Sequence, residues 1–519
     1  MKLTKQFRAL VILASMAASI MATKAQGMPR TIAAGGNGDL NISHSLYVTN
    51  DGKLYAMGDN SRGQLGDGTT TSRSTPVQVP GAANVVAVAA GGAHSLYLTG
   101  DGKLYAMGDN SHGQLGNGTT TNSSTPVLVA SDVVIAAAGS YQSFYVTSNG
   151  KLYAIGANTY GLLGDGTTTN RSTPVQVPGA VNVVAVASGW LQSFYVTSDG
   201  KLYAMGNNHL GELGDGTTTA RNKPVLVATN VFDVATANHH TIFLTNDGDV
   251  YAMGRNDYGQ YGNGTYMLSN PTPKRVATDV VAVAANGHHS HYITINGWLW
   301  SMGDNQYGQL GDGTTIQRPT AVPVAANVVS VAAGPQHTLY VTTEGKLNAM
   351  GRNTNGQLGD GTTANRSGPT QVSGADNVNI GNNVDKPAFT TQPANQSVAV
   401  GQNVAFTAIA TGNPAPTYQW QSSTNGSTWA DIPGATGATI MLSAVTTAMN
   451  GTQYRCIAAN SQGTTTSYTA MLAVNGNNDA SGNNNSGRGG GGGAPSLLWL
   501  GAIVALMTLR QLARRRCAP

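Results

Sequence analysis

A glycine that follows methionine or isoleucine recurs along the first two-thirds of this chain at nearly constant spacing. The seven positions are Gly58, Gly108, Gly156, Gly206, Gly254, Gly303 and Gly351, at intervals of 48 to 50 residues. Each copy is too short to bury its own apolar face, so neighbouring copies must supply the core. A repeat architecture is therefore expected here, and periods of this length include propeller blades.

One copy divides into four short segments that are alternating or rich in β-branched residues. These segments are Val85–Ala90, Ser95–Thr99, Lys103–Met107 and Pro126–Val129. The pair Asp101-Gly102 is a hairpin turn signal, and it recurs as Asp-Gly or Asn-Gly in other copies. Four strands per copy and seven copies are what a radial propeller needs, and the small residues of VVAVAA suit its crowded innermost strand.

The copies also carry the motifs of a known family. The stretch AAGGAHSLYLTGDGKLYAMGDNSHGQLGNGTTT resembles the regulator-of-chromosome-condensation repeat, with its G-x-x-H-[ST], G-x-[VL]-[YW]-x-[WM]-G and N-x-x-G-Q-L-G elements. The resemblance covers roughly residues 31–372 and seven repeats, and it implies a seven-bladed β-propeller over 31–374. The segment Asn377–Gly381 is similar to the opening of a further repeat, and its pairing with the first blade would close the ring.

Residues 387–474 change character after a linker at 375–386. The stretches QPANQSVAVGQNVAFTAIATGNPAPTYQWQ and TIMLSAVTTAMNGTQYRCIAAN resemble a bacterial immunoglobulin-like domain. This resemblance assigns Trp420, Tyr454 and Cys456 to the core of a β-sandwich. Ala408 stands where the partner cysteine is expected, so no inter-sheet disulfide is predicted. The expected fold class is all-β: a seven-bladed propeller, then an immunoglobulin-like β-sandwich, with a C-terminal hydrophobic helix.

Both ends of the chain predict export. Residues 1–25 have a basic start, an apolar run and small residues, as a secretory signal peptide does. A Gly/Asn-rich linker at 475–493 precedes the hydrophobic segment and arginine cluster of 494–516, an order that resembles the sorting tails of bacterial surface proteins. We expect the body at the cell surface or outer envelope, with the C-terminal segment contacting the membrane at least transiently. A plain single-pass anchor is the alternative to a tail that is cleaved.

The formal net charge of +4 does not indicate nucleic-acid binding. Eight of the 28 basic residues lie in residues 1–25 and 494–519, which hold no acidic residue. The other 20 stand against 24 acidic residues, so the body is mildly acidic. A nucleic-acid interface needs a basic patch, and we expect none.

Carboxylates are scarce outside one repeated turn. The chain has only two glutamates, Glu212 and Glu344. Five aspartates belong to the G-D-G-T-T turn, namely Asp67, Asp165, Asp215, Asp312 and Asp360, and two copies have Asn117 and Asn263 instead. Asparagine replaces aspartate readily in turns, but it cannot replace a general base. We therefore expect no enzyme, no metal and no cofactor, with a polysaccharide-acting enzyme as the competing hypothesis.

One repeat position is always histidine or glutamine. Its seven occupants are His44, His94, Gln142, Gln192, His240, His289 and His337. Both residue types donate and accept hydrogen bonds, whereas zinc would need imidazole or thiolate. We expect a structural hydrogen bond to a neighbouring loop. The additional histidines His239, His288 and His291 leave a metal or ligand site open as an alternative.

The two residues before this position differ between copies and form the candidate binding site. They include Tyr141, Trp190, Leu191, His239 and His288, all in one class of inter-strand loop. Such loops should line one face of the ring, and exposed aromatic residues are typical of binding patches. We expect binding or adhesion to a protein or glycan outside the cytoplasm, with a passive envelope spacer as the alternative. Guanine-nucleotide exchange, which the resemblance associates with nuclear members, is not expected of an exported chain without a matching catalytic segment.

Overall fold

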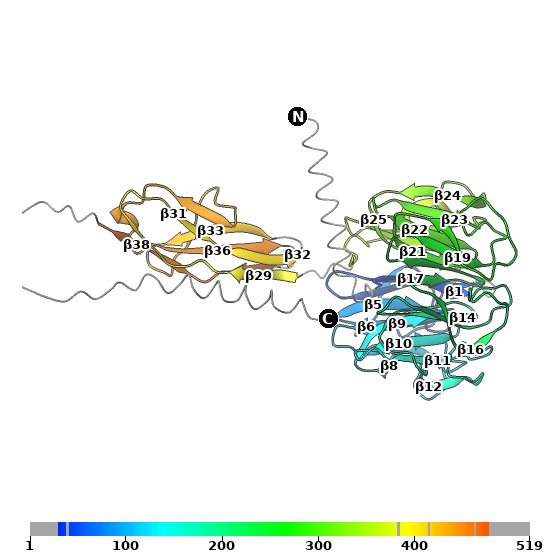
Figure 1. Ribbon diagram of the computed structural model, residues 1–519. Helices are drawn as coiled ribbons and strands as arrows, with labels where there is room; N and C mark the ends of the chain where they lie inside the picture. The colour runs from blue at the N-terminus through cyan, green and yellow to red at the C-terminus, as the bar shows by residue number, and fades with distance from the viewer. Residues whose placement is uncertain (1–29, 38–40, 381–384, 414–415, 461–462, 477–519) are drawn as a thin grey trace, which may run out of the picture. The chain divides into compact units, whose positions relative to one another are not determined.

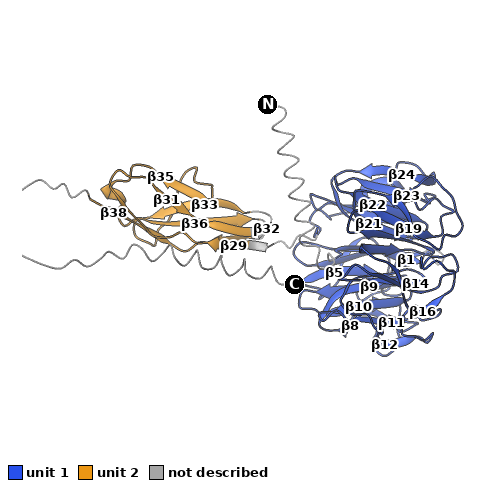
Figure 2. Cartoon of the chain, viewed as in Figure 1, with its two compact units in different colours: residues 1–384 blue, residues 385–519 orange. Residues whose placement is uncertain are grey.

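The computed structural model describes residues 30–476 apart from 38–40, 381–384, 414–415 and 461–462. The chain divides into two compact units between Val384 and Asp385 (Figure 2). Among the described residues the regular elements are strands, apart from one 3-10 turn, η1, at Thr447–Met449. This is the all-β class that the sequence predicts.

The first unit consists of seven four-stranded antiparallel sheets, the blades, and each blade has its strands in sequence order. Blade 1 has β1 (Ile32–Asn37), β2 (Ile42–Val48), β3 (Leu54–Gly58) and β4 (Arg73–Gln78), and blade 2 has β5 (Val85–Ala90), β6 (His94–Thr99), β7 (Leu104–Gly108) and β8 (Ser123–Ala130). Blade 3 has β9 (Val133–Ala138), β10 (Gln142–Thr147), β11 (Leu152–Gly156) and β12 (Arg171–Gln176), and blade 4 has β13 (Val183–Ser188), β14 (Gln192–Thr197), β15 (Leu202–Gly206) and β16 (Arg221–Ala228). Blade 5 has β17 (Val231–Thr236), β18 (His240–Thr245), β19 (Val250–Gly254) and β20 (Lys274–Ala277), and blade 6 has β21 (Val280–Asn286), β22 (His289–Thr294), β23 (Leu299–Gly303) and β24 (Arg318–Ala325). Blade 7 has β25 (Val328–Ala333), β26 (His337–Thr342), β27 (Leu347–Gly351) and β28 (Arg366–Gln371). The seven blades confirm the number predicted from the seven glycines.

The first strand of each blade is the innermost strand of the ring. First strands of consecutive blades contact one another, and β1 contacts β25, so these contacts run around a closed circle. Figure 1 shows β1, β5 and β17 near the middle of the unit and β8, β12 and β24 at its edge. Crowding at the centre explains the small side chains of these strands, such as VVAVAA in β5.

The apolar core lies between blades rather than inside them. One core cluster contains Leu46 and Leu54 of blade 1 together with Tyr97 and Met107 of blade 2. Six blades also carry a pair of stacked rings across their second and third strands, such as Tyr97 and Tyr105 with centroids 4.9 Å apart. A blade therefore completes its core only when its neighbour is in place.

The ring closes between blade 7 and blade 1. Val378 lies in a core cluster that joins side chains of both blades. The Asn50 N–H donates to the Asn377 carbonyl at 3.0 Å, and the Asn379 N–H donates to the Val48 carbonyl at 2.8 Å. Residues 377–379 thereby supply the start of the innermost strand of blade 1, the pairing that the sequence of this segment suggested.

The second unit is built from short strands around one apolar core. Its strands are β29 (Asp385–Thr391), β30 (Gln396–Ala399), β31 (Val404–Thr407), β32 (Ile409–Asn413), β33 (Thr417–Ser423), β34 (Ala430–Asp431), β35 (Thr439–Leu442), β36 (Gln453–Asn460), β37 (Gly463–Thr466) and β38 (Ala470–Asn475). The largest sheet has the order β30-β38-β36-β33-β34, and β29 pairs with β32 and β31 with β35. Trp420, Tyr454, Cys456 and Ala408 lie in the same core cluster. Cys456 is a free, buried thiol.

Three sequence predictions fall outside the described residues. They concern the signal peptide (1–25), the hydrophobic segment with its arginine cluster (494–516), and the C-terminal helix expected there. Within the part of the chain that the structure describes, no helix has the length and apolar character needed to cross a bilayer.

Candidate functional site

The repeated histidine position links each blade to the next one. The histidine Nε2 atom lies 2.8 to 3.2 Å from a hydroxyl oxygen of the following blade. The five pairs are His44–Ser95, His94–Ser143, His240–Ser290, His289–Thr338 and His337–Ser45, the last of which joins blade 7 to blade 1. The Ser95 hydroxyl donates its own proton to the Gln64 carbonyl at 2.8 Å, so the histidine must be the donor in its pair.

Burial keeps these histidines neutral. All five are fully buried, and this burial lowers the pKa of His44 and His94 to about 4 and that of His240 and His337 to about 3. Their Nδ1 atoms are buried with no hydrogen-bond partner among the described residues. A second proton on the ring would find no acceptor there, which opposes the charged form.

Glutamine fills the same position in blades 3 and 4, and the following blade changes with it. Gln142 Nε2 donates to Ser188 Oγ at 2.9 Å, and Gln192 Nε2 donates to Thr236 Oγ1 at 3.0 Å. In the other five blades alanine stands in register with Ser188 and Thr236, at Ala34, Ala90, Ala138, Ala285 and Ala333. A glutamine in one blade and a serine or threonine hydroxyl in the next therefore replace together the hydrogen bond that histidine makes between the other blades.

The repeated G-D-G-T-T aspartates hold their own turn. In blade 1 the Asp67 carboxylate accepts hydrogen bonds from the Thr69 backbone at 3.0 Å, from Asn60 at 3.0 Å and from Arg73 at 2.7 and 3.0 Å. Burial alone would raise the pKa of this carboxyl, but the hydrogen bonds hold it below its usual value. The two blades that have Asn117 and Asn263 in place of the aspartate also lack the arginine. Ser123 and Asn270 pair with Gly108 and Gly254 where Arg73 pairs with Gly58 in blade 1.

A third repeated hydrogen bond joins a side-chain carboxylate and a side-chain amide five residues apart. The pair is Asp59 with Gln64 in blade 1, where the amide donates to the carboxylate at 2.7 Å. In blade 4 the roles are exchanged, because Asn207 donates to Glu212 at 2.6 Å. Glu212 is fully buried, and burial raises its pKa. The Glu212 carboxylate therefore accepts the same hydrogen bond as the Asp59 carboxylate does, and it is not exposed to solvent.

The five candidate binding residues lie in the loops between the first and second strands, and all are half-buried. Trp190 and His239 meet across the interface of blades 4 and 5, with ring centroids 5.3 Å apart at 74°. The Leu191 backbone N–H donates to the Gln192 side chain at 3.1 Å. The other two, Tyr141 and His288, pack against residues that sequence reasoning did not select.

Those residues come from the loops between the third and fourth strands. In an antiparallel blade these loops open on the same face as the loops between the first and second strands. The missed residues are His112, Tyr160, His209, Tyr258, Tyr307 and Arg352, which lie in or beside the N-x-x-G part of the repeat. The sequence does mark this position as variable, because the residue before that glycine differs between copies, for example Arg62, Tyr160 and Asn355.

Together the two classes of loop form five ring contacts, each joining consecutive blades from blade 2 to blade 7. The pairs are His112–Tyr141 at 4.9 Å, Tyr160–His209 at 5.9 Å, Trp190–His239 at 5.3 Å, Tyr258–His288 at 4.6 Å and Tyr307–Arg352 at 4.9 Å. We call these ten residues the aromatic arc. Each pair places an aromatic ring against an imidazole or a guanidinium, and such contacts are favourable.

The aromatic arc does not run around the whole ring. The loop between the third and fourth strands has Ser61 and Arg62 in blade 1 and Asn355 in blade 7, and the loop between the first and second strands has Gly92 and Ala93 in blade 2, so no aromatic ring stands at these positions. At the near end of the arc, Asn37 of blade 1 donates to the Tyr141 hydroxyl at 3.1 Å. A sevenfold frame does not require this asymmetry, so the arc distinguishes one side of the ring from the other.

The described residues do not assemble a metal centre. No group of three or more His, Cys, Asp or Glu side chains among them is placed to hold an ion. His239 and His288 belong to separate pairs of the aromatic arc. His291 is buried, with Ser301 at 2.8 Å on one ring nitrogen and Thr338 at 2.9 Å on the other.

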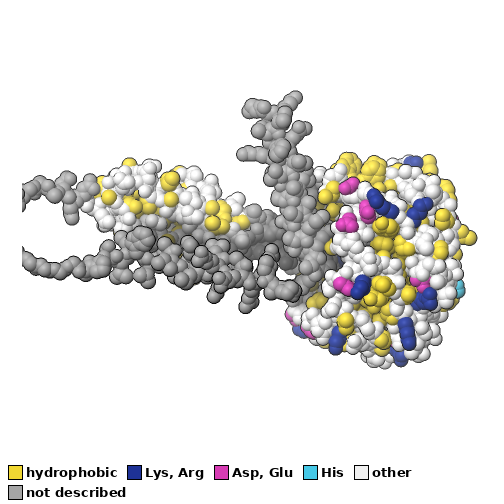
Figure 3. Space-filling view, viewed as in Figure 1, with side chains coloured by type: hydrophobic (Ala, Val, Ile, Leu, Met, Phe, Trp, Pro, Cys, Tyr) yellow, Lys and Arg dark blue, Asp and Glu magenta, His cyan; other side chains and the backbone are white. Residues whose placement is uncertain are grey.

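Charged side chains are mixed on the surface of the first unit. Figure 3 shows basic and acidic groups interspersed on the visible face, without a continuous basic area. Charged side chains of this unit also form ion pairs, such as Arg171 with Asp165 at 2.7 Å. The basic patch that nucleic acid would need is not seen on that face.

A closed ring with a repeated frame and variable loops on one face defines the class of protein: a seven-bladed β-propeller suited to binding. The chain belongs to the family of the RCC1-like domain, whose model matches residues 24–229 and 132–428. Residues 389–476 match a second model, described as a domain of unknown function (DUF8696).

Solved propellers share this fold. Human WBSCR16 is 20% identical, the match covers 62% of this chain and 94% of that one, and the TM-score is 0.57. Prp20p of Saccharomyces cerevisiae is 23% identical over 68% of this chain and 89% of its own, with a TM-score of 0.58. At such identities the likeness concerns the fold.

A curated relative matches a smaller part of the chain. Endoglucanase C of Cellulomonas fimi is 42% identical over 88 residues, which are 17% of this chain and 8% of that enzyme. The match therefore spans a small fraction of the enzyme's length.

Proposed function

We propose that this chain is an exported binding protein of the cell surface or outer envelope, and that the aromatic arc contacts a protein partner. The observation that carries the proposal is the arc itself: five ring contacts on one face, at positions where the repeated frame demands no aromatic residue. Tyrosine, tryptophan and arginine are the residue types that dominate binding energy at protein interfaces. Rings that already pack on a neighbour lose little conformational freedom when a partner docks.

A relative supports a protein as the ligand. Prp20p of yeast has binding properties toward Gsp1p and histones, so this fold serves protein partners elsewhere. We carry over the class of ligand and not its identity, because the two chains share 23% of their residues. A glycan is the second candidate, favoured by the partial match to Endoglucanase C.

The remaining parts of the proposal rest on the sequence. Residues 1–25 would direct export, and the hydrophobic segment at 494–516 would hold the chain at the membrane at least transiently. The second unit would be an immunoglobulin-like module that carries the propeller away from the surface. Its buried Trp420, whose ring N–H donates to the Gly437 carbonyl at 2.9 Å, supports that assignment.

Binding of the labelled full chain to intact cells of the encoding organism tests the proposal. We expect saturable binding, and we expect the variant Trp190→Ala with Tyr141→Ala to weaken it by about tenfold or more, because hot-spot truncations cost about 2 kcal/mol each. Lys103→Ala, on the opposite face, is the matched control. Protease treatment of the cells should abolish binding, whereas loss on periodate treatment alone would favour the glycan. Unchanged binding by the arc variant would overturn the assignment.

A further inference from the structure

The face opposite the aromatic arc carries the hairpins between second and third strands, and two consecutive blades depart from its pattern. In blades 1, 2 and 4 the turn reads Asp-Gly-Lys, and the lysine pairs with the aspartate at 2.7 Å, as Lys103 does with Asp101. Lysine also follows the glycine in blades 3 and 7, at Lys151 and Lys346. Blade 5 has Asp249 at this position, and blade 6 has Trp298.

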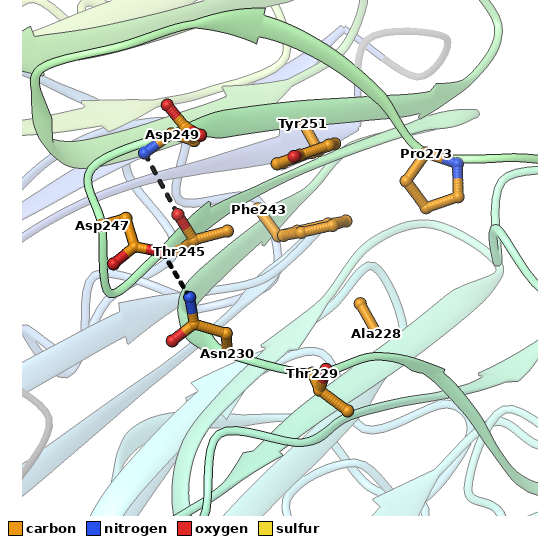
Figure 4. A pocket seen from close by; sticks show the side chains of 9 residues that line it. All are labelled: Ala228, Thr229, Asn230, Phe243, Thr245, Asp247, Asp249, Tyr251 and Pro273. Carbon is orange, nitrogen blue, oxygen red and sulfur yellow. Dashed lines mark hydrogen bonds between the residues drawn. The ribbon is translucent and has the colours of Figure 1, made fainter.

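A pocket of about 310 Å³ lies at each departure. The residues that line the pocket of blade 5 are Ala228, Thr229, Asn230, Phe243, Thr245, Asp247, Asp249, Tyr251 and Pro273 (Figure 4). The pocket of blade 6 is lined by Thr294, Asn296, Trp298, Trp300 and Pro323. Both use the same four hairpin positions, in the order threonine, Asx, the substituted lysine position and an aromatic residue of the third strand. We call the two pockets the hairpin site.

The pocket of blade 5 combines an aromatic wall with carboxylates. Tyr251 and Phe243 stack with centroids 5.2 Å apart and planes 8° apart. Figure 4 shows Asp247 and Asp249 on one side of these rings and Pro273 on the other. Neither carboxylate has the lysine partner found in the frame. Asn230 donates to Asp247 at 2.6 Å, and Arg275 lies 3.3 Å from Asp249 on the outer strand.

The pocket of blade 6 is more aromatic and has no carboxylate among its lining residues. Trp298 is 41% exposed, which is high for a tryptophan. Trp298 and Trp300 are two residues apart, so their side chains lie on the same face of the hairpin. Trp300 packs on Tyr292 at 6.2 Å, and the Thr294 hydroxyl and the Asn296 amide form the polar edge.

We propose that the hairpin site binds a neutral oligosaccharide. A sugar ring has an apolar C–H face and a rim of hydroxyl groups, so it needs an aromatic surface beside hydrogen-bonding oxygens. Both pockets offer this combination. The Asp247 carboxylate has no lysine partner, and a carboxylate makes stronger, charge-assisted hydrogen bonds to hydroxyl groups. The volumes lie at the small end of ligand pockets, which suits one or two sugar units in each blade.

A cationic ligand fits the same residues less well. The carboxylates of blade 5 would attract an ammonium group, but the pocket of blade 6 has no acid to do so. An apolar ligand would leave Asp247, Asp249 and Asn296 without hydrogen bonds to it. The chemistry that the two pockets share is aromatic surface with hydroxyl and amide partners, and equivalent sites in consecutive blades favour a linear chain that engages both. This inference does not rest on the aromatic arc, which lies on the other face.

Titration calorimetry of the full chain tests the inference. The probes are neutral hexasaccharides of β-1,4-glucose, β-1,3-glucose, β-1,4-xylose and β-1,4-N-acetylglucosamine, with hexalysine as a cationic probe. We expect saturable binding of at least one saccharide. Asp249→Lys with Trp298→Lys should weaken that binding by about tenfold or more. This double variant restores the residue that five other blades carry, so its thermal midpoint should stay close to that of the parent.

The controls separate the two faces. Lys103→Ala changes an ordinary hairpin and should bind saccharide as the parent does. The arc variant Trp190→Ala with Tyr141→Ala should also keep full saccharide binding, so failure of the arc proposal leaves this result unaffected. No binding of any saccharide, binding of hexalysine in its place, or undiminished binding by the double lysine variant would overturn the inference.

Discussion

The interfaces between blades and the two faces of the ring differ in how their residues change from copy to copy. At the interfaces, residues change in matched pairs. Gln142 comes with Ser188, and Gln192 comes with Thr236. On the faces they change without an accompanying change in the repeated frame, as Trp190 and Trp298 show.

The difference follows from burial. Polar groups at an interface are removed from water, so a donor or acceptor that loses its partner costs about 1–3 kcal/mol. A single change there is unfavourable until the partner changes too. A residue on a face keeps its access to solvent and carries no such cost. The interfaces therefore maintain the ring, and the faces are free to acquire the aromatic arc and the hairpin site.

The strongest test of the interface is a change that no partner can compensate. A Cβ atom on Gly91 would lie 2.3 Å from His94 Cε1 and 2.5 Å from the Gly139 carbonyl of blade 3. Gly91→Ala must displace a buried ring and a neighbouring backbone, so we expect a loss of about 3 kcal/mol or more in the free energy of unfolding. Urea unfolding followed by circular dichroism measures it.

Gly368→Ala is the matched control, because no atom lies within 4 Å of a Cβ atom at that position. We expect it to change stability by less than about 0.5 kcal/mol. Equal losses in the two variants would show that crowding at the interface is not the cause.

A smaller loss of stability is expected where another blade of this chain shows which second substitution compensates the first. The Asp67 side chain is 3% exposed and pairs with Arg73, so Asp67→Asn should cost about 1–3 kcal/mol. Adding Arg73→Ser reproduces the combination of blade 2. The double variant should be more stable than the sum of the two single effects predicts, by about 1 kcal/mol. Thermal unfolding of all four proteins completes the cycle, and strict additivity would mean that the pairing is coincidental.

Sequence reasoning predicted the ring well because its signals are local. The glycine period fixes the number of blades, and turns such as Asp101-Gly102 fix the hairpins. It also named four of the ten residues of the aromatic arc, those that stand just before the histidine position. It missed His112 and Tyr258 because each meets its partner across an interface, about half a repeat away in sequence.

The hairpin site was not predicted for a different reason. In sequence, Asp249 and Trp298 are residues after a turn glycine, where any polar or aromatic residue is ordinary. The difference becomes informative beside the lysine ion pairs that the hairpins of blades 1, 2 and 4 form in the structure. The same limit applies to Ser188, whose tie to Gln142 crosses between blades.

The smallest effect on stability is expected when the histidine hydrogen bond between two blades is replaced by the glutamine hydrogen bond that other blades use. His94→Gln together with Ala138→Ser builds in blades 2 and 3 the pair that Gln142 and Ser188 form, so stability at pH 7 should stay within about 1 kcal/mol of the parent. His94→Gln alone should be less stable, because Ser143 loses its donor and the glutamine gains no hydroxyl.

The pH dependence of the same variants tests the neutral histidine. Burial lowers the pKa of His94 to about 4 in the folded protein, whereas an unfolded histidine titrates near 6.5. Between these values the unfolded state binds more protons, so acidification destabilises the fold by up to about 1.4 kcal/mol per pH unit for each such histidine. Glutamine does not titrate, and the double variant should therefore lose about 1–2 kcal/mol less than the parent between pH 7 and pH 5. Urea unfolding at the two pH values measures this, and parallel losses would mean that His94 is not the neutral donor to Ser143.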